Sequence, residues 1–500
     1  MGAAKPVRTA GQASSGTQQT ARNGLLWGER EHGHTMCCLE KRLFTEEPMR
    51  PRILARFGCR LAAVLLAAVA PTTARAEPAA VQPATYAAPA PDAEAQHEAT
   101  AKQVRLVKQL IATRRTDPTL PAQLVQLTAD LPAADGVACF EHLAEMHAQA
   151  GDYNAAADVR RSLVDRWPDQ PAALAATRWL IALYGSSEVA WAKRTKRVVP
   201  RGLKPVEDPQ ASPPEASTEF AQYAVLAGDL AVQKHPSWND DPPLLMARSA
   251  AARRVRGGDA ALARLRRLRG LPPGDPWGDA ARMESWLQEL RSEAPPKGLV
   301  ACPLTGAPVL DGQLADDCWQ SAARIALTPG GTNPSPTTAR SAPATEVLLA
   351  RDAEYLYLAV RAAKAVPQAP VVQMQGVDGR RDYDTAERRG DHVQVRLDLD
   401  RDYATWFEWV IDARGHTADS AWTDAAWNPE WFVAASDDAQ QWRAEAAIPW
   451  TSLGAAAPAT GEAWAVAVER RIRPGAKPLA AFTAANDPPT PAAFGILRFQ

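Results

Sequence analysis

Alternation of apolar and polar side chains with a period of two is the feature that most restricts how this chain folds. It begins after residue 298 and recurs in short runs separated by Gly, Pro and Asp. The run HVQVRLDLD, residues 392–400, places its four aliphatic side chains at one parity and polar residues at the other. Because side chains of a strand point alternately to opposite faces, such runs predict half-buried strands. We expect residues 300–500 to form an antiparallel β-sandwich.

The residues before this segment follow a different period. Between residues 96 and 295 apolar side chains recur at helical spacing. The stretch 150–168 joins Ala-Gly-Asp-Tyr to a helical run that stops at Trp-Pro, and it resembles one tetratricopeptide repeat. We therefore expect an α+β multidomain chain, in which a helical, tetratricopeptide-like domain (96–295) precedes the sandwich. Such an array binds proteins through its concave face, although an irregular helical domain without a partner fits the same pattern.

The first 95 residues have the composition of export and linker segments. Residues 49–76 combine a basic start, an apolar run and a small-residue end, which predicts a secretory signal peptide cleaved after Ala76. We expect Met49 to be the native start and the patternless residues 1–48 to be a non-native or disordered extension. Residues 77–95 are rich in Ala and Pro and predict a flexible linker. These features indicate a secreted or periplasmic protein of the cell envelope; a cytosolic protein with a short buried helix is the alternative.

The charge balance argues against nucleic acid as a partner. The net charge is -1, so the chain offers no overall electrostatic attraction for a polyanion. Arginines gather between residues 253 and 269, and we expect them on the solvated faces of helices. The apolar run of the signal segment is too short to span a bilayer, so we expect no membrane span in the mature chain.

Three cysteines follow the expected cleavage point: Cys139, Cys302 and Cys318. Cys302 and Cys318 bracket one short segment, a spacing that suits a disulfide in an oxidising compartment. Two buried thiols are the alternative. The sequence contains no C-x-x-C pair, which argues against a structural zinc site.

Five motifs occur in order over roughly residues 302–500. They are PVLDGQLADDCWQSA, ATEVLLARDAEYLYLAVRA, GDHVQVRLDLD, EAAIPWTSLG and AFGILRF. This series resembles the family 9 carbohydrate-binding modules and their relatives in the DOMON-like superfamily. The resemblance implies a β-sandwich that binds sugar rather than catalyses, and it implies structural calcium. It also implies structural roles for Asp311, Gly312 and Trp319, with Trp319 in the core.

The sugar clamp of that family is not reproduced at the matching positions. Family 9 modules hold the end of a sugar chain between two tryptophan rings. One ring follows an asparagine near the C-terminus of the family, but no tryptophan follows Asn486 here. The other ring precedes the GDHVQV motif, where this chain offers only Tyr383. A sugar site in this chain would therefore use other side chains.

Tryptophan is concentrated between residues 422 and 450. A sugar needs a flat apolar surface with fixed polar groups around it, and the loop DSAWTDAAWNPEW contains both. Asn428 precedes a proline, which restricts its backbone and stiffens the loop. The candidate ligand-binding residues are Trp422, Trp427, Asn428, Trp431, Tyr383 and Arg470. A place at the lip of the sandwich is the alternative for these rings, whereas Trp442 and Trp450 share the parity of an apolar strand face and are expected in the core.

Carboxylates crowd the loop DGRRDYDTAERRGD. Calcium is a hard cation that takes several oxygen ligands, so this loop predicts a calcium site. The candidate metal ligands are Asp378, Asp382, Asp384 and Asp391. A solvated loop whose charges nearly cancel is the alternative, so we expect either no cofactor or structural calcium.

The sequence contains no recognisable catalytic pattern. It lacks a G-x-S-x-G nucleophile motif, and no spacing sets two carboxylates at glycosidase separation. We expect an exported, non-catalytic protein that binds carbohydrate, acting as an accessory module if it serves glycan degradation. One alternative is a structural or protein-interaction role without sugar binding. The other is a DOMON-type haem site that uses His392, His416 or Met374.

Overall fold

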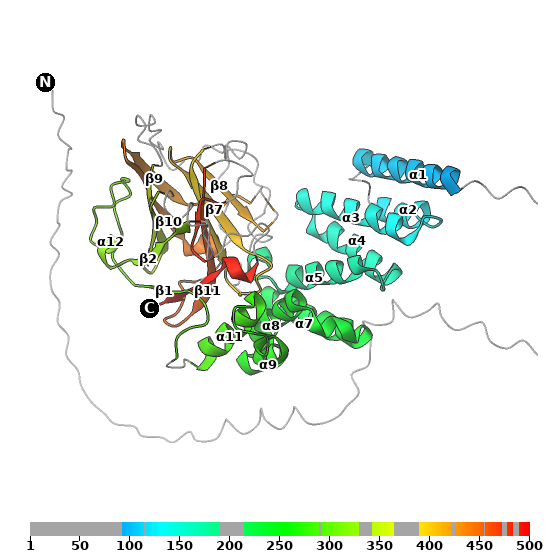
Figure 1. Cartoon of the computed structure of the whole chain (residues 1–500), viewed down its shortest axis with the longest axis horizontal. Helices are drawn as coiled ribbons and strands as arrows, with labels where there is room; N and C mark the ends of the chain where they lie inside the picture. Colours follow the sequence, from blue (N-terminus) through cyan, green and yellow to red (C-terminus); the bar gives the residue numbers. More distant parts are fainter. Residues whose placement is uncertain are drawn as a thin grey trace, which may run out of the picture. The chain divides into compact units, whose positions relative to one another are not determined.

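The computed structural model describes residues 93–114, 117, 119–190, 215–289, 293–329, 343–364, 390–422, 424, 427–454, 456–472, 478–483 and 490–500. These residues form a helical part followed by a β-sandwich, which is the fold class that the two periodicities predict (Figure 1). Several predicted features lie outside the described residues: residues 1–48, the signal peptide with Ala76, Tyr383, Asp378, Asp382, Asp384 and Met374.

The helical part consists of helices joined mostly by short turns (Figure 1). Its elements are α1 (Ala93–Arg114), α2 (Leu120–Leu127), α3 (Ala133–Gln149), α4 (Tyr153–Arg166), α5 (Pro171–Gly185), α7 (Glu215–Lys234), η2 (Pro236–Asp240), α8 (Pro242–Arg256), α9 (Gly258–Arg264), α10 (Arg266–Arg269) and α11 (Pro276–Glu289). Among the described helices, none is long and apolar enough to cross a bilayer.

Local sequence signals explain where these helices begin. Asp152 caps α4 by accepting a hydrogen bond from Ala155 N at 3.1 Å, and Asp241 caps α8 by accepting one from Leu244 N at 3.0 Å. Proline stands in the first turn of α2, α5 and α8, where its missing N–H would have no helical partner in any case. The resemblance of this part to tetratricopeptide repeats stays a prediction.

The sandwich is built from short strands and a few single-turn helices. Its elements are β1 (Leu299–Cys302), α12 (Cys318–Ser321), β2 (Ala323–Ala326), β3 (Thr328–Pro329), β4 (Thr345–Arg351), β5 (Tyr355–Ala363), β6 (His392–Asp398), β7 (Phe407–Asp412), β8 (Thr417–Ala421), β9 (Phe432–Asp437), β10 (Gln441–Pro449), η4 (Trp450–Leu453), β11 (Ala463–Arg471), β12 (Ala480–Ala481), η5 (Pro491–Ala493) and β13 (Gly495–Phe499).

The strands form two sheets. Sheet A has the order β1-β13-β11-β6-β7-β8, with β12 beside β11 and β3 beside β12, and sheet B has the order β2-β4-β5-β10-β9. All these pairings are antiparallel except that of β1 with β13, which is parallel. The predicted antiparallel sandwich therefore includes one parallel pair at the edge of sheet A. Strand β1 is the first strand of the sandwich in the sequence and β13 is the last. They lie side by side and run in the same direction, since no hairpin turn joins them.

Apolar and aromatic side chains fill the space between the sheets. Val393, Val395 and Leu397 of β6 belong to this core, as their parity predicts. Trp442 and Trp450 are buried there as well, so the expectation for both rings is confirmed. Ala444 and Ala446 line the same face of β10, which leaves room for rings of that size.

One buried carboxylate binds the entry segment of the sandwich to sheet B. Glu445 lies on the outer face of β10 and accepts hydrogen bonds from the segment that precedes β2. The donors are the main-chain N–H groups of Asp311 (3.0 Å), Gly312 (2.6 Å) and Leu314 (3.2 Å) and the indole N–H of Trp319 (2.7 Å). Gly312 has a φ of +77°, and a Cβ there would lie 2.7 Å from the main-chain carbon of Ala435. The structural roles expected of Asp311, Gly312 and Trp319 are therefore confirmed.

The expected disulfide between Cys302 and Cys318 is not formed. Cys302 lies in the core between the sheets, whereas Cys318 packs on the outer side of sheet B, and both are free thiols. Burial raises the pKa of Cys302 to about 12 and that of Cys318 to about 11, so both thiols are protonated near neutral pH. The two side chains are close in sequence but lie on different sides of one sheet.

Replacing Glu445 by Gln tests how strongly this carboxylate holds the entry segment. Glutamine offers one acceptor oxygen and an NH₂ group, so some of the buried donors would face another donor. We expect the free energy of unfolding to fall by about 2–4 kcal/mol, because a hydrogen bond to a charged group contributes about 1.5–3 kcal/mol and a buried donor without a partner adds a penalty. Urea unfolding followed by tryptophan fluorescence measures the change.

Glu346→Gln is the matched control for this experiment. Glu346 lies on β4 of the same sheet and pairs with Arg324 at 3.0 Å and Arg361 at 3.1 Å, both of which are partly exposed. An exposed ion pair contributes about 0–1 kcal/mol, so the control should change stability little. Equal destabilisation by the two substitutions would contradict the role given to Glu445.

Candidate functional site

The outer face of sheet A carries charged side chains on three neighbouring strands. The alternation that sends Val395 into the core turns the neighbouring residues of β6 outward, and the register places them beside outward residues of β7 and β11. We call this set the polar ladder; it consists of Gln394, Arg396, Glu408, Glu469 and Arg471. All of its members are less than a tenth exposed.

The charges of the polar ladder are paired. Arg396 Nε donates to Glu408 Oε2 at 2.9 Å, and its Nη1 lies 3.6 Å from Glu469 Oε2. Arg471 Nη2 donates to Glu469 Oε2 at 2.9 Å, and the Gln394 amide donates to Glu408. Guanidinium groups and carboxylates balance each other here, which is the condition for keeping charge away from water.

Two atoms of the polar ladder have no hydrogen-bond partner among the described residues. They are Arg396 Nη1, which is a donor, and Glu469 Oε1, which is an acceptor, and both are buried. Trp406 lies beside Arg396, with its ring centre 5.9 Å from the Arg396 guanidinium carbon. A buried polar atom without a partner costs about 1–3 kcal/mol. The ladder is therefore chemically suited to a ligand that both donates and accepts hydrogen bonds.

The sequence predicts which side chains of each strand point away from the core. Only the pairing of the strands shows that these side chains contact one another. Period-two alternation marks the polar residues of β6 as opposite to the core, and such residues usually face water. Their burial is possible because Arg396 of β6 pairs with Glu408 and Glu469, which lie 12 and more residues away in the chain. A single strand read alone cannot show that its outward charges meet partners.

Arg470 and Asp391 bind each other at one end of the sandwich. Arg470 is fully buried, and its Nε donates to Asp391 Oδ1 at 2.8 Å. It also donates to Thr345 Oγ1 and to the main-chain oxygen of Ala363, each at 2.8 Å. The indole N–H of Trp442 donates to the second Asp391 oxygen at 3.0 Å. These contacts correct both predicted roles: the Arg470 guanidinium is used inside the sandwich instead of binding sugar, and the Asp391 carboxylate is used by Arg470 and Trp442 instead of a metal ion.

Two rings of the tryptophan-rich loop belong to the core. Trp427 is 4% exposed and stacks on Phe407 with 4.6 Å between ring centroids. Trp431 is 1% exposed, and its indole N–H donates to Asp419 Oδ2 at 3.0 Å. Neither ring offers a face to a ligand, which corrects the binding role expected for both. The loop turns inward because these large apolar surfaces gain more from burial than from solvent contact.

Trp422 and Asn428 are placed differently from those two rings. Trp422 stacks on Tyr153 of α4 at 5.7 Å and lies 5.2 Å from the ring of Trp179 in α5. Its ring therefore contacts the helical part, which corrects its expected role as a sugar platform. Asn428 is exposed, but the structure brings none of the three described rings, Trp422, Trp427 and Trp431, to it as an open binding face.

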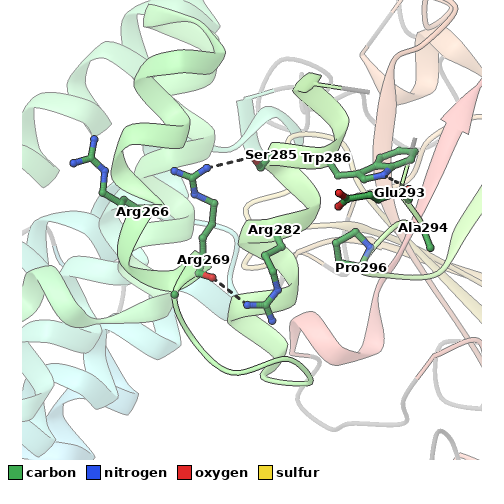
Figure 2. Close-up of a pocket in the computed structure, with 9 residues that line it drawn as sticks. Arg266, Arg269, Arg282, Ser285, Trp286, Glu293, Ala294 and Pro296 are labelled. Carbon is green, nitrogen blue, oxygen red and sulfur yellow. Dashed lines mark hydrogen bonds between the residues drawn. The ribbon is translucent and has the colours of Figure 1, made fainter. Parts of the chain in front are cut away.

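A pocket of about 370 Å³ lies between α10, α11 and the segment before β1 (Figure 2). Its lining includes Arg266, Arg269, Arg282, Trp286 and Glu293. The arginines suggest an anion, but Arg282 and Arg269 also donate to groups of the protein. Arg282 donates to the main-chain oxygen of Leu271 and to Asp279, each at 2.6 Å, and Arg269 donates to Ser285 at 3.2 Å. This pocket is a weaker candidate than the polar ladder.

The histidines of the haem alternative lie near strand ends of sheet A. His392 Nδ1 is 2.9 Å from the main-chain oxygen of Gly390, and His416 Nδ1 is 3.2 Å from Asp412 Oδ2. Met374 lies outside the described residues. The haem alternative stays a prediction.

No protein-family model and no curated protein sequence matches this chain. Among solved structures, the chain is similar to a family 9 carbohydrate-binding module from Caldicellulosiruptor kristjanssonii in complex with cellotriose, with 15% identity and a TM-score of 0.30 over 41% of this chain and 94% of the module. A family 9 module from the same organism in complex with glucose gives 15% identity and a TM-score of 0.29 over 41% of this chain and 96% of the module. Similarity at this level transfers no residue role to this chain.

Replacing Arg470 by Met tests the closure of the sandwich end. Methionine keeps most of the side-chain volume but leaves the partly buried Asp391 carboxylate without its cation. We expect the free energy of unfolding to fall by about 3–5 kcal/mol, because removing one partner of a buried pair leaves an uncompensated charge. The midpoint of chemical unfolding checks this expectation.

Arg443→Met is a control near the same end of the sandwich. Arg443 pairs with Asp438 at 2.9 Å, and the Asp438 side chain is 44% exposed. We expect this change to cost less than about 1 kcal/mol. A loss from Arg470→Met no larger than that from Arg443→Met would show that Arg470 does not hold the sheets together.

Proposed function

We propose that this protein binds carbohydrate through the polar ladder of sheet A and that it is an exported protein without catalytic activity of its own. The observation that carries the proposal is two buried atoms without a hydrogen-bond partner among the described residues, Arg396 Nη1 and Glu469 Oε1, on side chains that form an ion pair with each other. A hydroxyl group is both a donor and an acceptor, so adjacent hydroxyls of one sugar satisfy both atoms. Hydrogen bonds with one charged partner are the stronger kind.

The resemblance in sequence supports the class of ligand. Five motifs in the order seen in family 9 modules lie in the sandwich, and the fold is a two-sheet sandwich as the resemblance implied. The clamp positions of that family are empty of tryptophan here, so the ladder takes the place of the clamp in this proposal. The predicted signal peptide points to polysaccharide of the envelope or the environment as the target.

The arrangement of the ladder suits recognition better than proton transfer. Glu408 and Glu469 each form an ion pair with a guanidinium group, so their oxygens are held in fixed contacts. A general acid needs a carboxyl group that holds its proton near neutral pH. The half-buried ring of Trp406 offers an apolar surface at the edge of the same group.

A glycan array probed with the whole protein tests the proposal, with Arg396→Lys and Glu469→Gln as variants. Lysine keeps the positive charge beside Glu408 and Glu469 but loses the forked guanidinium. We expect the wild-type protein to retain at least one class of glycan and each variant to bind it about 10–100-fold more weakly, because a hydrogen bond to a charged group contributes about 1.5–3 kcal/mol. Titration calorimetry with the retained glycan gives the affinities.

Arg361→Lys is the matched control for the glycan experiment. Arg361 lies on the outer face of sheet B and pairs with Glu346 at 3.1 Å, so the same exchange is made outside the ladder. It should leave the affinity unchanged, and circular dichroism shows whether each variant is folded. Wild-type affinity in both ladder variants would place the site elsewhere, and an array without any retained glycan would overturn the proposal.

One observation favours a second candidate function, a protein-interaction role of the helical part. Large apolar side chains are exposed along α7: Phe220, Tyr223, Leu226 and Leu230. Their spacing of three or four residues puts them on one side of the helix. An array without retained glycans, combined with self-association that Leu226→Asp abolishes, would favour this role over sugar binding.

A further inference from the structure

The turn that follows β6 brings together carboxylates from distant parts of the chain. Its sequence, Asp-Leu-Asp-Arg-Asp, places an acidic side chain at every second position: Asp398, Asp400 and Asp402. Glu188, which follows α5 in the helical part, reaches the same turn. All these side chains are at most 5% exposed. Carboxylates buried together repel one another, so their assembly needs a physical reason.

The separation of the oxygens fits one bound cation. One oxygen each of Glu188, Asp398 and Asp400 lies within 4.8 Å of the others. Calcium binds oxygen at about 2.3–2.6 Å, so two ligands on opposite sides of one ion are about 5 Å apart. The three oxygens can therefore belong to one coordination sphere without movement of the main chain.

Main-chain N–H groups hold these carboxylates in place. Leu399 N donates to Glu188 Oε1 at 2.5 Å, and Tyr403 N donates to Asp398 Oδ2 at 2.8 Å. Each bond uses one lone pair of its acceptor and leaves another for a second partner. Oriented carboxylates of this kind are ligands whose geometry is already fixed before an ion arrives.

A second observation points to a missing partner. Asp400 is 5% exposed, and its Oδ1 accepts no hydrogen bond from any described residue. Its other oxygen accepts a hydrogen bond from Ser187 N at 2.6 Å. Buried carboxylate oxygens are normally bonded, so an orphaned one among converging carboxylates is the place where a cation would bind.

The nearby arginines neutralise the group only in part. Arg253 and Arg401 both pair with Glu284 of α11, and Arg401 Nε lies 2.7 Å from it. Arg254 Nη1 lies 3.9 Å from Asp400 Oδ2 and forms an ion pair with that one carboxylate of the group. The contacts also correct the expectation that Arg253 and Arg254 lie on a solvated helix face. Burial, followed by repulsion from neighbouring carboxylates, raises the pKa of both Glu188 and Asp398 well above the usual range.

We propose that Glu188, Asp398 and Asp400 bind a calcium ion that joins the helical part to the sandwich. Hard oxygen ligands without described sulfur or imidazole among them select calcium or magnesium over zinc. Calcium is favoured because it accepts irregular sets of carboxylates, whereas magnesium requires a nearly ideal octahedron. Because Glu188 comes from outside the sandwich, the site forms only when both parts of the chain are present.

Calcium titration calorimetry on the whole protein, stripped of metal with EDTA, tests the proposal. Asp400→Asn removes one charged ligand of similar size, and Asp438→Asn is the control, since Asp438 lies in the β9–β10 turn and its side chain is 44% exposed. We expect the wild type and Asp438→Asn to bind calcium alike. We expect Asp400→Asn to bind one ion fewer per chain or to bind that ion at least tenfold more weakly.

Thermal unfolding with and without calcium separates a metal ligand from a structural carboxylate. Calcium should raise the melting temperature of the wild type and of Asp438→Asn but leave that of Asp400→Asn unchanged. In EDTA, Asp400→Asn should melt no lower than the wild type, because it removes a charge from a mutually repelling group. Calcium binding that Asp400→Asn leaves intact, no calcium binding by the wild type, or a marked loss of stability of Asp400→Asn in EDTA would each overturn the proposal.

Discussion

The hydrogen bonds of Arg470 hold the two sheets of the sandwich together at one end. Arg470 stands on β11 of sheet A, yet its donors reach Asp391 beside β6 and two groups of sheet B, Thr345 and Ala363. A fully buried guanidinium is tolerated only when nearly all its N–H groups are bonded. Because its partners come from both sheets, the guanidinium fixes their separation at this end, and the core between them can stay apolar up to that point.

The outer face of sheet A has two regions, one that packs against helices and one that carries charged side chains. Toward β13, small residues of β11 (Ala463, Ala465 and Ala467) allow side chains of α8 and α11 to pack closely, among them Met246 and Met283. Toward β7, the same face carries the charged residues of the polar ladder. Strand β6 carries Gln394 and Arg396 of the polar ladder, and its last residue, Asp398, belongs to the acidic group that Glu188 reaches. One central strand therefore links the packing of the helical part to the candidate binding face.

Sequence periodicity predicted the fold class, the strands of the core and the burial of Trp442 and Trp450, because these depend on neighbours within one strand. From the sequence we assigned Trp427 and Trp431 to a ligand, because a loop has no periodicity that would predict which way a ring turns. We also assigned Arg470 and Asp391 to two different ligands, although they bind each other across 79 residues of chain. Glu188, the residue of the helical part that lies near Asp398, is still farther away in the chain. Pairings of this range depend on tertiary structure and leave no local pattern to recognise.

The abundance of tryptophan follows from the small residues of the strands. Alanine occupies inward positions on β10 and on neighbouring strands, and interiors must nevertheless be filled to crystal-like density. Rings from η4 and from the loop before β9, such as Trp450 and Trp431, supply the missing volume. Because the core uses these rings, sugar binding at the polar ladder would rest on charged hydrogen bonds more than on stacking. Sites of that kind discriminate strongly against ligands that lack a hydroxyl, since a missing partner leaves buried charge unsatisfied. On this argument the protein should select the hydroxyl pattern of a sugar rather than the flat face of its ring.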